Sequence, residues 1–133
     1  RAPGEFVEAV TIPRQPDRLR VWKVSKRFDQ DISAVCGAFD LAVEDGRIAA
    51  ARIAFGGMAA TPKRARAVEA ALLGQPLTPE GVAAADAAWA EDFRPISDMR
   101  ASADYRLKVA RNLLRRYALD HAGRATSVLE VRP

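Results

Sequence analysis

The sequence has one cysteine, one histidine and no long apolar run among its 133 residues. The lone Cys36 has no partner for an intramolecular disulfide, and with His121 it makes too small a set for a zinc or iron–sulfur site. No apolar stretch approaches the roughly 18 residues that a membrane-spanning helix needs. These scarcities exclude a disulfide scaffold, a metal-bound module and a membrane span, and they favour a reducing compartment such as the cytoplasm.

Patterns for nucleophilic or phosphate chemistry are also missing. His121 falls near the end of a predicted helix, where a surface role is favoured over a place in a catalytic triad. Gly56-Gly57 precedes a helix, but no Gly-Lys-Ser/Thr follows, so a turn is favoured over a phosphate-binding loop. Capping of a helix accounts for Ser97 and Asp98 better than anion binding does. We therefore predict no catalytic residue and no metal ligand in this chain.

Charge of one sign is not concentrated anywhere. The 21 basic residues are interleaved with 17 acidic ones, although the net charge is +4. Arg111, Arg115 and Arg116 fall on the outer side of the last predicted helix without interleaved aromatic residues. A solvated or domain-facing surface is therefore favoured over nucleic-acid binding. We expect neither nucleic acid nor a membrane among the partners.

The first half of the chain carries strand patterns. Asp45-Gly46 predicts a tight two-residue hairpin, because both central positions of such a turn need positive φ. The alanines at 49–51 would let a helix or a neighbouring domain approach closely. The chain opens on Arg1 rather than Met and soon enters an alternating segment, so we expect no signal peptide and a piece of a longer protein. Alternation of apolar residues predicts strands over residues 6–12, 19–26, 32–43 and 48–55.

The second half carries helix signals. Thr61-Pro62 and Thr78-Pro79 each combine an N-cap oxygen with proline at the first helical position, and Ser97 is a third start. Gly74 and Gly123 are placed where a helix would stop. The predicted helices span residues 62–73, 79–93 and 97–121. Strands followed by helices indicate an α+β domain, with a small antiparallel sheet packed on a helical layer.

Lys23 is the least expected residue in this pattern. It shares a strand face with the apolar Leu19 and Val21, and a charged loop, KRFDQD, follows it. An ammonium on an apolar face must form an ion pair, extend to the surface or contact a ligand, because leaving it buried and unpaired costs several kcal/mol. From the residues alone these alternatives stay open, and the chain is a soluble α+β module that serves a larger assembly.

Three separated stretches resemble a known family. VWKVSKRFDQDISAV, ARIAFGGMAATPKRA and FRPISDMRASADYRL are similar to the C-terminal part of the FAD-binding subunit of bacterial xanthine dehydrogenases, from about Glu5 to Ala118. CO dehydrogenases and aldehyde oxidases have a similar GGxAxTPxRA segment. The resemblance implies a domain over residues 17–125 of the CO dehydrogenase flavoprotein C-terminal type, with a three-stranded antiparallel sheet packed on a three-helix bundle. Residues 1–16 would be the last strand and linker of a preceding FAD-binding domain, and 126–133 a tail.

The same resemblance implies a function. In the family, electrons pass from a purine hydroxylated at a molybdopterin centre through two 2Fe-2S clusters to FAD, and from FAD to NAD. The family's flavin contacts fall on Val7 and Lys23, and the ammonium of Lys23 would lie near the isoalloxazine. The following loop resembles the segment that governs NAD access, with Arg27, Asp29 and Asp31 as candidates.

The partners and the alternatives follow from what this chain lacks. Most FAD contacts, the cluster ligands and the molybdopterin-binding subunit would lie elsewhere, so the partners implied are that subunit and the preceding FAD-binding and iron–sulfur domains. Alone, the chain is expected to be inactive. The first alternative is the flavoprotein domain of another molybdenum hydroxylase, of CO dehydrogenase or aldehyde oxidase type. The second is a non-catalytic interaction or nucleic-acid-binding module.

Overall fold

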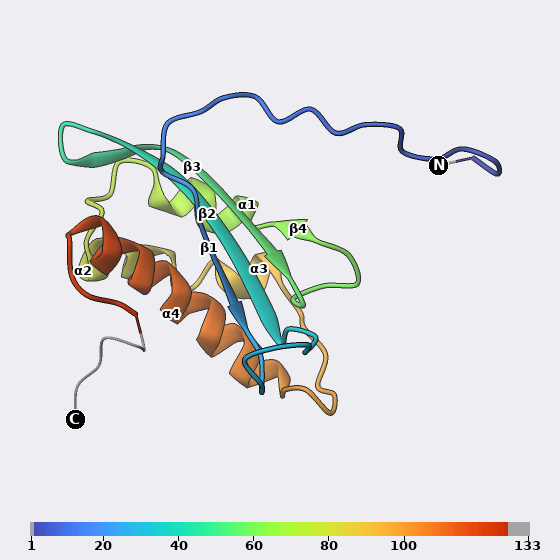
Figure 1. Ribbon diagram of the computed structural model, residues 1–133. Helices are drawn as coiled ribbons and strands as arrows, with labels where there is room; N and C mark the ends of the chain where they lie inside the picture. Colours follow the sequence, from blue (N-terminus) through green and yellow to red (C-terminus); the bar gives the residue numbers. More distant parts are fainter. Residues whose placement is uncertain (1, 128–133) are drawn as a thin grey trace.

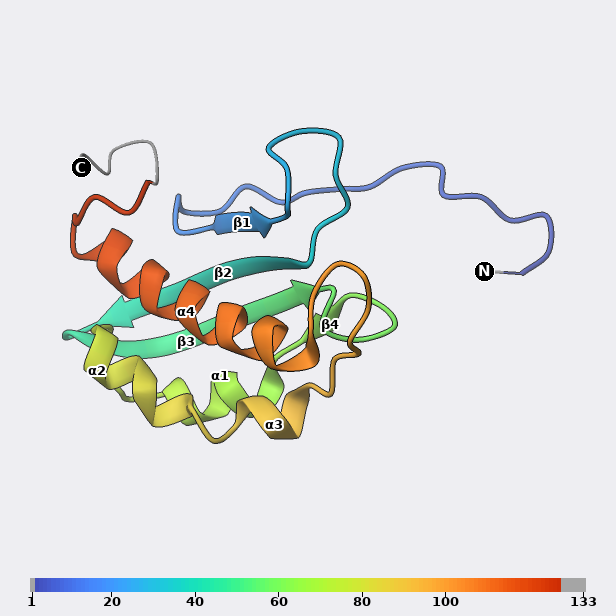
Figure 2. The same cartoon turned by 90° about the horizontal axis from the view of Figure 1, so that it is seen from below.

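The architecture is a four-stranded antiparallel sheet with all its helices on one side (Figure 1, Figure 2), and the computed structural model describes residues 2–127. The strands lie in sequence order and are β1 (Arg20–Val24), β2 (Val35–Glu44), β3 (Arg47–Gly56) and β4 (Lys63–Arg64). The helical segments are α1 (Arg66–Leu72), α2 (Pro79–Val82), η1 (Ala83–Ala85), α3 (Trp89–Asp92) and α4 (Ala103–His121). The predicted α+β class with an antiparallel sheet is confirmed.

The hairpin between β2 and β3 forms as predicted. Asp45 and Gly46 have φ angles of 49° and 73°, and the flanking Glu44 and Arg47 pair with each other. Both central residues of the two-residue turn thus have the positive φ expected of its sequence. The turn brings the two longest strands of the sheet together over ten residues each.

The core lies between the sheet and the helices. Alternation along β2 and β3 turns one set of side chains toward the helical layer, among them the buried Phe39 and Phe55. The Phe55 ring contacts Phe39, Trp89 and Phe93, with ring centroids 5.5, 5.5 and 5.7 Å apart. Trp89 of α3 and Phe93 just after it thus pack on Phe55 of β3, and their burial joins the two layers.

The sheet has four strands rather than three, and this shortens the first helix. Lys63 and Arg64 pair with Phe55 and Ala54 of β3 and form β4. The segment expected to begin a helix at Pro62 is therefore extended, and α1 starts only at Arg66. Pairing with an open sheet edge has overridden the local Thr-Pro signal.

The predicted three-helix bundle also differs from the structure. The second helix is divided into α2, η1 and α3, and bonds from the Asp86 and Ala88 amides to carbonyls three residues back tighten the chain between them. The third helix starts at Ala103 instead of Ser97, because the Asp98 carboxylate organises the preceding residues into a loop. The Thr78 cap and the stop at Gly123 (φ 69°) are as predicted.

The predicted strand over residues 6–12 is wrong for this chain. The segment is extended and exposed, forms no strand, and runs outward from the sheet (Figure 1). Its role as the last strand of a preceding domain stays a prediction. The tail expected at 126–133 lies largely outside the described residues. No helix within residues 2–127 is both long and apolar enough to cross a bilayer.

Candidate functional site

Three loops meet at one end of the sheet. β1 and β3 both run antiparallel to β2, so Val24 and Gly56 end their strands at the edge where Val35 begins the next one. The loop of residues 25–33, called here the β1–β2 loop, and the Gly56-Gly57 turn therefore lie at the same end. The loop that precedes α4 reaches this end as well (Figure 2). The three stretches singled out in the sequence are thus neighbours in space.

A buried arginine joins these three loops. Arg106, in the second turn of α4, is only 3% exposed. Its guanidinium donates to the carbonyl oxygens of Ala34 and Gly57 and to Oδ1 of Asp98, the last at 2.7 Å. One acceptor comes from each of the three stretches. A planar, permanently charged group with five donors suits such a junction of acceptors.

Asp98 anchors the arginine from the third loop. Its Oδ1 accepts hydrogen bonds from the amides of Arg100 at 2.9 Å and Ala101 at 3.2 Å, besides the one from Arg106. The amide of Arg100, followed by that of Ala101 and the charge of Arg106, holds the pKa of the Asp98 carboxyl below its ordinary value. The carboxylate therefore stays ionised next to the guanidinium at neutral pH.

The β1–β2 loop is organised by Asp31. Its Oδ2 accepts from the amides of Lys26 at 3.0 Å and Arg27 at 3.1 Å, and the Arg27 guanidinium lies 3.7 Å from Oδ1. Partial burial raises the pKa of Asp31, but these amides, that of Ile32 and the Arg27 charge outweigh it, so the pKa is lowered. Asp29 accepts from the amide of Gln30 at 2.8 Å. Arg27 and Asp31 are thus in contact, Asp29 is bonded to its neighbour Gln30, and Asp31 has a structural role within the loop.

Two bonds attach the base of this loop to its surroundings. The Ala34 amide donates to the Val24 carbonyl at 2.8 Å, which closes the loop between the end of β1 and the start of β2. The Lys26 ammonium donates to the Met99 carbonyl at 2.6 Å and so ties the loop to the one before α4. A hollow of about 380 Å³ lies between the two loops.

Lys23 lies on the face of the sheet that no helix covers. It pairs with Cys36, which in turn pairs with Gly56, so small residues flank it across the sheet. Its side chain is exposed, and its ammonium has no hydrogen bond or ion pair with any described residue. Val7, the other predicted flavin contact, is 69% exposed on the N-terminal segment, which runs outward from the sheet (Figure 1).

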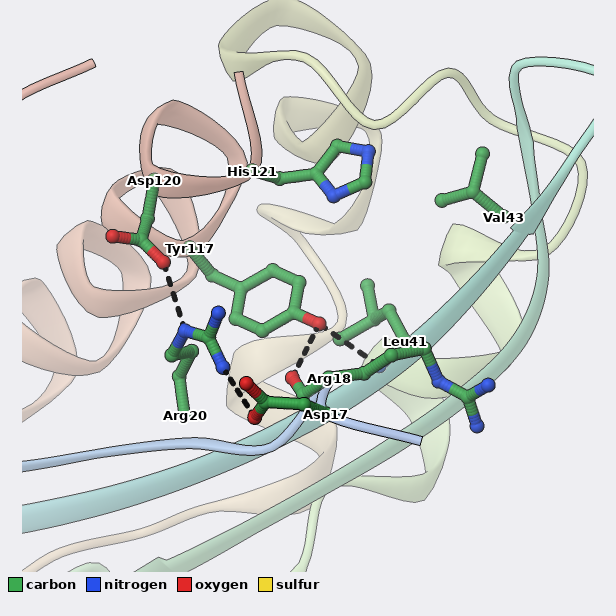
Figure 3. Close-up of a pocket in the computed structure, with 8 residues that line it drawn as sticks. All are labelled: Asp17, Arg18, Arg20, Leu41, Val43, Tyr117, Asp120 and His121. Atoms are coloured by element: carbon green, nitrogen blue, oxygen red, sulfur yellow. Dashed lines mark hydrogen bonds and ion pairs between the residues drawn. The ribbon is translucent and has the colours of Figure 1, made fainter. Parts of the chain in front are cut away.

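The other end of α4 carries a hollow of about 270 Å³ (Figure 3). The Tyr117 hydroxyl donates to the Arg18 carbonyl at 2.8 Å and accepts from the Leu41 amide at 3.3 Å, and burial raises its pKa. Arg20 bridges to Asp120 at 3.0 Å at the same place. These bonds fix the entry of the chain into β1, so we assign this end a structural role. His121 is exposed here, as predicted.

Neither Arg106 nor Tyr117 was predicted from the sequence as a site residue. Both lie on the buried stripe of α4 with Ala110, Leu113 and Leu114, since Arg106 precedes Ala110 by one turn. A charge on an apolar helix stripe was therefore a signal in the sequence, of the same kind as Lys23 on its strand. No group of three or more metal-ligating side chains occurs within residues 2–127.

Comparison with known proteins gives a consistent set of relatives. Residues 20–121 match the model of the CO dehydrogenase flavoprotein C-terminal domain. The nicotine 6-hydroxylase medium subunit of Paenarthrobacter nicotinovorans is 32% identical over 92% of this chain and 43% of its own length. This chain therefore spans less than half of that curated relative.

Solved structures agree with this match. CO dehydrogenase from Oligotropha carboxidovorans superposes with a TM-score of 0.72 at 28% identity, over 86% of this chain and 40% of the other. Quinoline 2-oxidoreductase from Pseudomonas putida 86 superposes with a TM-score of 0.68 at 28% identity, over 80% and 37%.

Proposed function

The chain belongs to the family of CO dehydrogenase flavoprotein C-terminal domains, and we propose that it forms one wall of the flavin site in the FAD-binding subunit of a molybdenum hydroxylase. Within that class we propose a xanthine dehydrogenase that passes electrons from purine hydroxylation to NAD. The observation that carries the proposal is the unpaired, exposed Lys23 on an uncovered sheet face, within a chain of this family.

The surroundings of Lys23 suit a flat ring system. Its neighbours across the sheet, Cys36 and Gly56, have little or no side chain, and the next row consists of Val21, Ala38 and Ala54. Such a surface leaves room for a planar group beside the ammonium, and no described carboxylate competes for the positive charge. These residues therefore fit FAD placed against this end of the sheet.

Each residue would have a simple task in that site. Bound FAD would supply the electron transfer from the iron–sulfur side of the enzyme to NAD. The Lys23 ammonium would hold positive charge beside the ring and so favour negative charge there. The β1–β2 loop, with Arg27, Asp29 and Asp31, would border the path of the nicotinamide. Val7 would contact the flavin only if the N-terminal segment joins the preceding domain.

The experiment is a Lys23→Ala variant of the full molybdenum hydroxylase, with its two half-reactions measured separately by stopped flow. Reoxidation of the reduced flavin by NAD should slow on the order of 10-fold, because one charge-assisted interaction is worth roughly 1.5–3 kcal/mol. Reduction by xanthine should change little. Lys108→Ala, which removes an exposed lysine from α4, is the matched control. Equal loss in both half-reactions, or none in either, would rule out the assignment of Lys23.

A second candidate concerns the substrate. The similarity to the medium subunit of a nicotine 6-hydroxylase favours hydroxylation of another nitrogen heterocycle as the alternative to purines. The substrate would be selected in the molybdopterin-binding subunit, outside this chain. Turnover of the complete enzyme with xanthine, nicotine and quinoline separates the candidates, and activity on nicotine or quinoline with none on xanthine would replace the xanthine proposal while leaving the flavin site intact.

A further inference from the structure

The stretch FRPISDMRASADYRL has no task in the flavin site proposed above, yet it is held in place by many bonds. Ser97 Oγ accepts from the Ala103 amide at 2.9 Å, and Ser102 Oγ accepts from the Tyr105 amide at 3.2 Å. Asp98 then pairs with the buried Arg106. The stretch therefore builds a rigid start of α4 that points one guanidinium at the end of the sheet.

Arg106 reaches two pieces of backbone that belong to the proposed flavin site. Ala34 closes the β1–β2 loop. Gly57 follows Gly56, the last residue of β3, which pairs with Cys36, and Cys36 in turn pairs with Lys23. Both carbonyls accept from the same terminal nitrogen, so their spacing is fixed by one atom. The Nε of Arg106 has no partner among the described residues, so the contacts of this side chain run through its terminal nitrogens.

Gly57 shows how tight this junction is. It has a φ of 81°, and a Cβ built on it would overlap the Ala34 carbonyl and come within 3.2 Å of the Arg106 guanidinium. A side chain at this position would therefore separate the two loops or displace the arginine. Gly74 has a similar φ of 76° but open space around its Cβ position, which makes it a control for backbone strain alone.

We propose that Arg106 is a positioning residue that fixes the β1–β2 loop against the Gly56-Gly57 turn, and thereby sets how the electron acceptor reaches the flavin. The second half of this inference rests on the proposed function, whereas the first half concerns this chain alone. Asp98 keeps the guanidinium aimed, and Lys26 supplies a second tie through the Met99 carbonyl. The loop would keep its internal Asp31 bonds without Arg106, but would lose its fixed place on the domain.

The first test measures amide hydrogen exchange in this chain carrying Arg106→Lys. A lysine keeps the charge but cannot reproduce the planar fork that serves Ala34, Gly57 and Asp98 together. Amides of residues 24–35 should exchange faster by on the order of 10-fold, while those of β3 upstream of the turn stay protected. Arg115→Lys is the matched control, because Arg115 also lies on α4 but pairs with Asp86, which follows η1 and not one of the three loops.

A second variant keeps the inference testable if Arg106→Lys does not fold. Gly57→Ala should also accelerate exchange in residues 24–35, and Gly74→Ala should not, although both place an alanine at positive φ. Unchanged exchange of the loop in a folded Arg106→Lys or Gly57→Ala chain would overturn the positioning role. This outcome does not depend on whether the flavin proposal holds.

The kinetic test uses Arg106→Lys in the full enzyme and compares KM with kcat. The KM for NAD should rise by on the order of 10-fold, while the rate of flavin reduction by xanthine stays close to that of the unmodified enzyme, since the altered loop borders only the acceptor path. Equal losses in both half-reactions would mean a merely structural role. A loosened loop with an unchanged KM for NAD would overturn the functional half of the inference. If Lys23→Ala also left the reoxidation of the flavin by NAD unchanged, the proposed flavin site itself would be wrong.

Discussion

Two charged residues at one end of the sheet have opposite environments. Arg106 is buried and donates hydrogen bonds to three acceptors, whereas Lys23 is exposed and donates none to the described residues. A buried charge is tolerated only when it is paired and hydrogen-bonded, and Arg106 meets that condition. The ammonium of Lys23 is available to a ligand, whereas the buried guanidinium of Arg106 stabilises the fold.

The Asp98–Arg106 pair should make the stability of the chain depend on pH. The pKa of Asp98 lies below its ordinary value of 3.8 in the folded state, so its contribution is complete above that value and disappears as the pH falls through the lowered pKa. Urea unfolding of the native chain and of Asp98→Asn should differ most near about pH 6 and converge toward about pH 3. Curves that stay parallel over this range would show that the carboxylate charge does not contribute.

At the scale of the elements, the start of α1 depends on a distant residue. The amides of Ala67 and Val68 donate to the two carboxylate oxygens of Asp92 at 3.1 and 3.0 Å. Asp92 lies at the end of α3 and is only 8% exposed. It thus takes the part of an N-cap for a helix whose own N-cap residue, Ala65, makes no side-chain bond. The negative charge also suits the helix dipole.

Asp92→Ala should therefore destabilise the chain more than an ordinary surface change. Loss of an N-cap costs roughly 0.5–2 kcal/mol, and burial places this one toward the upper end of the range. The free energy of unfolding from urea titration would measure the loss. Glu91→Ala, at the adjacent exposed carboxylate, should change it by less than about 0.5 kcal/mol. Similar losses for both variants would contradict the capping role.

The elements also show how far local sequence signals reach. Asp45-Gly46 formed its turn and Thr78 its cap, with Oγ1 accepting from the Gly81 amide at 3.0 Å, because the partners lie within a few residues. Thr61-Pro62 gave the same signal, but the helix begins only at Arg66, since the next two residues pair with the edge of β3. Asp92 caps α1 across 24 residues of sequence, and no local pattern predicts such a bond.

The sequence predicted individual residues and loops of the candidate site, but not how they come together. The face of Lys23 followed from alternation, and the resemblance drew attention to all three loops. Their meeting at Arg106 could not be read from spacing, because it needs the tertiary arrangement of α4 against the sheet. The charged position on the stripe of α4 was nonetheless visible before Ala110. The argument that singled out Lys23, a charge on an apolar face, would also have identified Arg106.

At the scale of the whole molecule, one face of the sheet is covered by no helix within residues 2–127. The helices occupy the other face (Figure 2), and Val21, in the middle of β1, is 55% exposed. Its cross-strand neighbours Ala38 and Ala54 line a hollow of about 220 Å³ on this face, together with Arg52 and Arg64. Small apolar residues on a sheet permit close approach of another layer. We expect the FAD-binding domain that we propose to precede this chain to pack on this face.

Ala38→Glu tests this expectation, because it adds length and charge at the centre of the face. This chain should fold with a melting temperature within about 4 °C of the native value, since Ala38 is partly exposed on the uncovered face and such a shift corresponds to roughly 1 kcal/mol or less. The full FAD-binding subunit carrying Ala38→Glu should lose bound FAD, measured as the flavin-to-protein absorbance ratio after gel filtration, because a buried unpaired carboxylate would separate the two domains. Ala70→Glu, on the exposed side of α1, should retain its FAD. Full retention in Ala38→Glu would mean that this face stays open to solvent in the complete subunit, and the wall of the flavin site would then have to be sought elsewhere in the chain.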